Sequence, residues 1–146
     1  SAGHILDGLE SCLIGKPQDI FSDLQIFADL LKKWQNVQNL VSRETLPDLW
    51  TRHMRDSLQL LRYFPVQQGV VLDLGSGGGF PAIRLLGLCL PFWSEKTCAL
   101  LHKGRECGEE LIQAGAVWRF DVLCLPSETD PAGVIVKIDQ LSAKLS

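Results

Sequence analysis

Long apolar runs, an excess of positive charge and a secretion signal are all missing from this 146-residue sequence, and each absence excludes a class of protein. No stretch reaches about 18 uncharged apolar residues, so no membrane-spanning helix is predicted. The 14 Lys and Arg residues are outnumbered by 17 Asp and Glu residues, which argues against a generally basic, histone-like binder but leaves room for a local basic face. We expect a soluble, cytoplasmic protein without membrane partners.

Metal-binding and disulfide patterns are missing as well. The number of cysteines is odd, none forms a Cys-x-x-Cys pair, and no histidine has a cysteine at ligand spacing. We therefore expect reduced, largely buried thiols and no metal site. The cysteines are Cys12, Cys89, Cys98, Cys107 and Cys124, and the histidines are His4, His53 and His102.

Apolar spacing divides the chain into a helical N-terminal extension, residues 1–66, and an α/β portion, residues 67–146. Helices are predicted over residues 5–14, from Pro17 or Ser22 to about residue 39, and over residues 44–64. The second helix should bury one stripe and turn Gln35 outward. That stripe is Leu24, Phe27, Leu30 or Leu31, Trp34, Val37 or Gln38, and Val41, which makes Trp34 a core residue rather than a base-stacking platform.

The second portion alternates between strand and helix patterns. Strands are predicted at residues 70–72, 97–101, 120–125 and 133–138, with helices over residues 82–90 and 105–113. Such alternation indicates a parallel sheet with crossover helices. Four strands at most make this an incomplete sheet with an exposed edge.

The segment with the clearest chemical meaning is residues 70–81, which read Val-Val-Leu-Asp-Leu-Gly-Ser-Gly-Gly-Gly-Phe-Pro. An apolar run ends at an acid, Asp73, and a loop of four glycines follows. Glycine lets the backbone approach a ligand closely and adopt positive φ angles. Pro81 suits the first position of a helix, where an N–H would have no partner. This order is typical of a strand, a tight turn and a helix whose N-terminus faces a ligand.

Three interpretations of this loop compete. A purely structural turn explains four glycines beside an acid poorly. A dinucleotide fingerprint fails at Phe80, passes only in a looser form that starts at Gly77, and lacks an acid about 20 residues further on for a ribose hydroxyl. The pattern Asp-x-Gly-x-Gly-x-Gly, from Asp73 to Gly79, is instead that of the first motif of class I S-adenosylmethionine-dependent methyltransferases.

The flanking segments strengthen the third interpretation. Leu31-Lys32-Lys33-Trp34-Gln35-Asn36-Val37-Gln38-Asn39-Leu40-Val41-Ser42 comes first, then Arg52-His53-Met54-Arg55-Asp56-Ser57-Leu58, then the glycine loop. In this order and at these distances, residues 20–90 resemble the RsmG/GidB family of bacterial 16S ribosomal RNA (guanine-N7) methyltransferases. The resemblance implies a class I, Rossmann-like parallel sheet behind a helical extension. It also implies S-adenosyl-L-methionine as cofactor and 16S ribosomal RNA, or a small-subunit precursor, as partner.

The resemblance also implies the site. Gly75 and Phe80 correspond by position to residues of the family that contact the cofactor. The full predicted cofactor-binding set is Asp73, Gly75, Ser76, Gly77, Gly79, Phe80 and Pro81. Methylation of guanine N7 needs no proton removal at the nucleophile, so we expect neither a serine or cysteine nucleophile nor a strong general base.

Arg52, His53, Asp56 and Ser57 form the best polar constellation, since their spacing puts them one helical turn apart in pairs. Two interpretations are open: a face that meets the cofactor edge or RNA phosphate, or a buried polar cluster in which Asp56 pairs with Arg52. The same choice, between phosphate contacts and solvated helix faces, holds for the basic residues of the helical region. These are Lys32, Lys33, Arg43, Arg52, Arg55 and Arg62.

The resemblance weakens beyond residue 90. His102 stands where class I enzymes place an acid for the ribose hydroxyls, and we interpret it as a loop histidine rather than an altered ligand. A non-catalytic RNA- or partner-binding relative on the same scaffold is the main alternative function.

Overall fold

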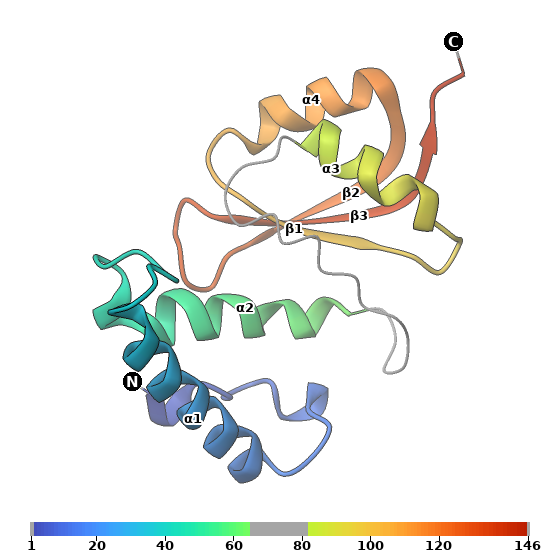
Figure 1. Cartoon of the computed structure of the whole chain (residues 1–146). Helices are drawn as coiled ribbons and strands as arrows, with labels where there is room; N and C mark the ends of the chain where they lie inside the picture. Colours follow the sequence, from blue (N-terminus) through green and yellow to red (C-terminus); the bar gives the residue numbers. More distant parts are fainter. Residues whose placement is uncertain (1, 65–81, 146) are drawn as a thin grey trace. The chain divides into compact units, whose positions relative to one another are not determined.

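A computed structural model describes residues 2–64 and 82–145 of the chain (Figure 1). The chain divides into two compact units, an N-terminal unit (Ser1–Arg62) and a C-terminal unit (Tyr63–Ser146). The predicted strand at residues 70–72 and the glycine loop lie outside the described residues.

The N-terminal unit is helical. It contains short 3-10 turns at Ala2–His4 and Glu10–Cys12, helix α1 (Pro17–Gln35), and an unbroken helical run from Leu46 to Tyr63. That run comprises a 3-10 turn (Leu46–Asp48), a π-helical turn (Trp50–Arg55), helix α2 (Asp56–Leu58) and a final 3-10 turn (Gln59–Tyr63). Pro17 begins α1 and Lys32 and Lys33 lie in its last turn, both favourable placements.

The single helix predicted over residues 5–14 is wrong, because Gly8 interrupts it at a φ of +72°. This backbone conformation ends a right-handed helix and suits glycine. The apolar residues before and after the interruption still reach the interior, since Ile5, Leu6 and Leu9 are all buried.

The buried stripe of α1 is rotated from the predicted one. Ala28 and Gln35 are buried, whereas Phe27 and Trp34 are about half exposed, at 54% and 51%. Ala28 packs in a core with Ile5, Leu6, Leu49 and Met54, flanked by Phe21, whose ring stacks on Trp50 with centroids 5.8 Å apart. The prediction of Trp34 as core is therefore wrong: it followed the largest apolar side chains, whereas the helix packs closely through a small residue.

Gln35 occupies the last buried position of α1 because its amide is fully used. Its Oε1 accepts hydrogen bonds from the backbone N–H groups of Leu40 and Val41, both at 3.0 Å, and its Nε2 donates to the Val41 carbonyl at 2.7 Å. A buried amide satisfied in this way costs little. The prediction that Gln35 faces outward is corrected by these bonds.

The C-terminal unit is an α/β structure, as predicted. It contains α3 (Ala82–Cys89), a 3-10 turn (Leu90–Phe92), β1 (Ala99–Lys103), α4 (Cys107–Val117), β2 (Trp118–Pro126) and β3 (Val134–Ala143). Each strand and helix predicted in this region is present, with shifted ends. Helix α4 continues through Gly115, where a stop was expected.

The three described strands lie in the order β1-β3-β2, and both pairings are antiparallel. The parallel pairing expected from the alternation is therefore not what these neighbours form. Residues 127–133 are too short for a crossover, so β2 and β3 form a hairpin, and β3 inserts between the two strands that α4 connects. Because β1 and β2 both oppose β3, they run parallel to each other without touching.

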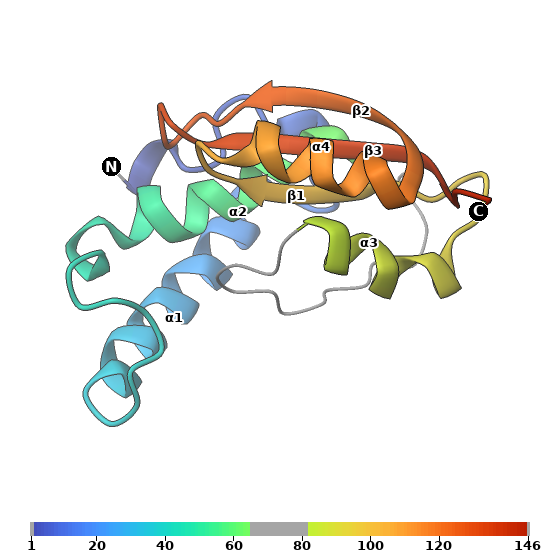
Figure 2. The same ribbon diagram turned by 90° about the horizontal axis from the view of Figure 1, so that it is seen from above.

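Helices α3 and α4 lie side by side on one face of this sheet (Figure 2). The core between helices and sheet includes Leu86 of α3, Ala114 of α4, Val136 and Ile138 of β3, all fully buried. The period-2 spacing of Val136 and Ile138 is what places both on the helix-covered face.

A β-bulge interrupts the β2–β3 ladder. Arg119 pairs with Ser142 and Asp121 with Asp139, so β3 carries one residue more than β2 between these pairs. Gln140 lies in this stretch with a φ of +53°, a left-handed conformation that is strained for a residue with a side chain.

The cysteines are free thiols, but the expectation that most are buried is wrong. Only Cys107 is buried, Cys124 is exposed, and Cys12, Cys89 and Cys98 are intermediate. Desolvation raises the pKa of the Cys89, Cys98 and Cys107 thiols, so these side chains are protonated and unreactive at neutral pH.

Candidate cofactor and substrate site

All the predicted cofactor-binding residues, Asp73, Gly75, Ser76, Gly77, Gly79, Phe80 and Pro81, lie outside the described residues. The structure describes where the loop leads. Helix α3 begins at Ala82, immediately after Pro81, as the motif predicts. Ala82, Leu85 and Leu86 of this helix are buried in the core of the C-terminal unit.

The start of α3 is held by a carboxylate from another helix. The backbone N–H of Ala82 donates a hydrogen bond to Glu110 Oε2 at 3.0 Å, and Lys103 Nζ lies 2.8 Å from the same oxygen. The Lys103 side chain is only 9% exposed, and that of Glu110 26%. The last residue of β1, the first residue of α3 and the first turns of α4 therefore meet at one point.

The electrostatics of this point favour a charged carboxylate. Desolvation raises the pKa of Glu110, but the hydrogen bonds from Lys103 and Ala82 and the positive charge of Lys103 outweigh it, and the net shift is downward. A negative charge at a helix N-terminus is also favoured by the helix dipole. The sequence analysis missed both residues, because no local pattern links three elements that only the fold brings together.

The second predicted set is not gathered into one cluster. His53 Nε2 lies 2.8 Å from Thr45 Oγ1, and Asp56 Oδ1 accepts a hydrogen bond from Gln59 Nε2 at 2.9 Å. Among the residues that the structure describes, Arg52 forms no ion pair with Asp56. Arg52 and Ser57 are exposed, and His53 and Asp56 are partly buried.

The basic residues of the helical region differ in their surroundings. Arg55 is partly buried and donates from Nη1 to the carbonyl oxygens of Ile5 and Asp7, so it has a structural role. The side chains at the other predicted positions are exposed: Lys32, Lys33, Arg43, Arg52 and Arg62. His102, expected in a loop, lies within β1 opposite Ile135, and is exposed.

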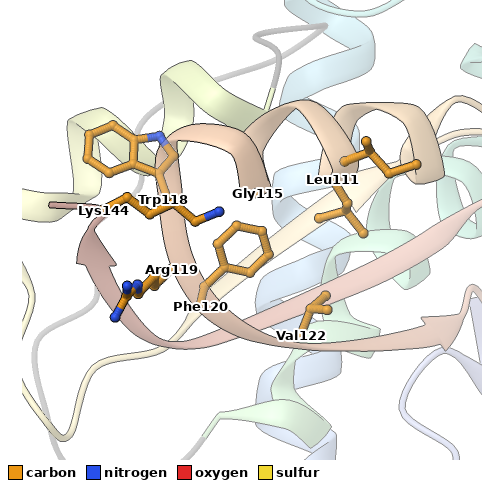
Figure 3. A pocket seen from close by; sticks show the side chains of 8 residues that line it. Leu111, Gly115, Trp118, Arg119, Phe120, Val122 and Lys144 are labelled. Atoms are coloured by element: carbon orange, nitrogen blue, oxygen red, sulfur yellow. The ribbon is translucent and has the colours of Figure 1, made fainter. Parts of the chain in front are cut away.

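A shallow groove of about 440 Å3 lies between α4 and β2 (Figure 3). Its side chains surround Phe120, and Arg119 and Lys144 lie at the end next to Trp118. None of the predicted site residues lines it. The lining residues are Leu111, Ile112, Gly115, Trp118, Arg119, Phe120, Val122 and Lys144.

Two absences can be stated for residues 2–64 and 82–145. No helix in these ranges is long and apolar enough to cross a membrane. No group of three or more His, Cys, Asp or Glu side chains within them is arranged to hold a metal ion.

Comparison with known proteins identifies the class: methyltransferases of small-subunit ribosomal RNA. Residues 20–103, more than half of the chain, match the GidB family model, described as rRNA small subunit methyltransferase G. The chain belongs to this family, which confirms the resemblance seen in the sequence. No solved structure matches the chain significantly.

Three relatives, each named ribosomal RNA small subunit methyltransferase G, illustrate the similarity. The Paramagnetospirillum magneticum protein is 28% identical, with 88% of this chain and 92% of the relative covered. The Ruegeria pomeroyi protein is 41% identical over 81% of this chain and 66% of the relative. The Gluconobacter oxydans protein is 30% identical over 79% of this chain and 91% of the relative.

The alignments also reveal a difference inside the chain. The alignment with the Paramagnetospirillum protein runs over 189 positions, more than the 146 residues available here. Gaps therefore fall within this chain, and the relative carries residues that have no counterpart in it.

Proposed function

We propose that this protein transfers the methyl group of S-adenosyl-L-methionine to N7 of a guanine in 16S ribosomal RNA, in the bacterial cytoplasm. The observation that carries the proposal is the family match over residues 20–103, because this range includes the glycine loop and the Arg52–Ser57 constellation. The RNA or a small-subunit precursor is the macromolecular partner.

The cofactor would be held by Asp73, Gly75, Ser76, Gly77, Gly79, Phe80 and Pro81. The start of α3 supports this placement, since Glu110 links its first residue to Lys103 at the carboxyl end of β1. Ligands of α/β proteins bind at this edge of a sheet. We further propose a class I arrangement in which β1 and β2 are parallel strands joined across β3 by α4, behind an extension of residues 1–66.

The chemistry asks little of the protein beyond alignment. Bound S-adenosylmethionine supplies an electrophilic methyl group on a sulfonium. Guanine N7 has a free lone pair, so the chain need only align the base, exclude water and accommodate the charge that passes to the purine. The target guanine should be in a loop or opened region, because the deep major groove of A-form RNA hides N7.

Arg52, His53, Asp56 and Ser57 remain the candidate residues on the RNA side. The exposure of Arg52 and Ser57 supports a contact with phosphate, whereas the hydrogen bonds of His53 and Asp56 serve their own helical run. Arg52→Ala should weaken RNA binding and leave cofactor binding unchanged.

The proposal is tested by incubating the protein with labelled S-adenosylmethionine and small subunits from cells that lack guanine-N7 methylation of 16S RNA. We expect one labelled guanine, mapped by nuclease digestion and mass spectrometry, and loss of labelling with Gly75→Val. Calorimetry tests the cofactor step on its own. A well-folded protein that binds ribosomal RNA but neither binds nor consumes S-adenosylmethionine would establish the non-catalytic alternative.

A further inference from the structure

Glu110 makes a contact between elements that the established family membership does not account for. Its carboxylate leaves α4, accepts the Ala82 N–H at 3.0 Å, and is paired with Lys103 at 2.8 Å. Lys103 is more than nine-tenths buried, so its ammonium group is committed to this region rather than to solvent.

The N–H of Ala82 is one of the backbone donors at a helix start that have no intrahelical acceptor. Such donors are usually satisfied by a side chain just before the helix, but here the acceptor comes from a residue 28 positions later. The body of α3 does not depend on this bond, because Leu85 and Leu86 are buried in the core. The bond therefore restrains one place, the junction at which Pro81 enters the helix.

We propose that Glu110, held in its charged form by Lys103, is a positioning residue for the cofactor loop. The inference rests on the proposed function. Pro81 is covalently joined to Ala82, so fixing the Ala82 N–H fixes the end of the glycine loop and the direction in which the chain leaves it. Without the carboxylate, α3 remains packed but its first turn frays, and the loop loses one of its two fixed ends.

The test compares three variants by calorimetry with S-adenosylmethionine and by thermal unfolding without it. Glu110→Ala removes the acceptor, Glu110→Gln keeps an oxygen that can accept the Ala82 N–H, and Glu109→Ala is a control at the exposed neighbouring position. We expect the dissociation constant to rise about tenfold in Glu110→Ala and about two- to threefold in Glu110→Gln. Glu109→Ala should bind as the wild type does.

Hydrogen exchange distinguishes positioning from a general loss of stability. In Glu110→Ala, peptides spanning residues 75–89 should exchange faster, while peptides from β3 should be unchanged. Wild-type affinity in a folded Glu110→Ala protein would overturn this inference alone. Absence of binding by the wild-type protein would instead overturn the proposed function, and the cofactor role of Glu110 with it. Should Glu110→Ala fail to fold, Glu110→Gln decides: faster exchange confined to residues 75–89 supports positioning, and unchanged exchange opposes it.

Discussion

The guanidinium of Arg55 donates a hydrogen bond to the carbonyl oxygen of Ile5 at 2.8 Å, across 50 positions of sequence. The same Nη1 reaches the carbonyl oxygen of Asp7 at 3.0 Å. These bonds attach the N-terminal turns to the helical run that carries the Arg52–Ser57 constellation, at the place where Gly8 prevents a continuous helix.

We predict that Arg55→Ala destabilises the protein by about 1–3 kcal/mol, because two carbonyl oxygens lose a charged donor. Urea unfolding followed by circular dichroism measures the change. Arg52→Ala is the matched control: this side chain is exposed, and the free energy of unfolding should change by less than about 0.5 kcal/mol. Equal effects of the two variants would contradict the structural role of Arg55.

Two glycines should respond to alanine with opposite signs. At Gly8 a Cβ would lie 2.8 Å from Arg62 Nη2 on a backbone with φ of +72°, so Gly8→Ala should lower stability. At Gly115, inside α4, a Cβ would meet nothing within 4 Å, so Gly115→Ala should raise stability by about 1 kcal/mol through helix propensity. Thermal unfolding of both variants checks the signs, and a stabilised Gly8→Ala would refute the described turn.

The Lys103–Glu110 pair should make stability depend on acid pH. Because the pKa of Glu110 is lowered in the folded protein, the unfolded chain binds its proton more readily. The stabilisation is therefore fully present above the ordinary value of 4.5 and is lost as pH falls through the lower folded pKa. Lys103 and the Cys107 thiol are the other titratable groups nearby, and both are protonated throughout this window.

Denaturant unfolding at several pH values between 7 and the acid limit measures this contribution. The difference in unfolding free energy between wild type and Glu110→Gln should shrink as pH falls below 4.5. A difference that stays constant across the range would show that the charge of Glu110 contributes nothing.

The bulge at Gln140 gives a fourth prediction. Gln140→Gly should be neutral to stabilising, by up to about 1 kcal/mol, because glycine adopts a positive φ without steric cost. Gln140→Val should destabilise, since a β-branched side chain tolerates this conformation least. Thermal unfolding ranks glycine, glutamine and valine at this position, and valine above glycine would count against the bulge.

Local patterns predicted the elements of the C-terminal unit well and their pairing badly. The β-branched run of β3 and the apolar spacing of α3 are visible in sequence because period and propensity are local properties. That β3 would insert between β1 and β2 depends on which edges meet, and alternation alone favoured parallel neighbours.

The candidate site shows the same division. Glycines after an acid predict a ligand-binding loop because the backbone chemistry is written in consecutive residues. Neither the Glu110 contact with Ala82 nor the outward turn of Trp34 has such a signature. Hydrophobicity placed Trp34 inside, while close packing at Ala28 and the hydrogen bonds of Gln35 set the actual phase of α1.

The middle strand of the sheet is also the last of the described strands to be synthesised. While residues 134–143 are still within the ribosomal exit tunnel, β1 and β2 have no common partner, and the nascent chain can assemble its helices but not this sheet. Closure of the C-terminal unit must then be a late, largely post-translational event in which one segment threads between two waiting edges.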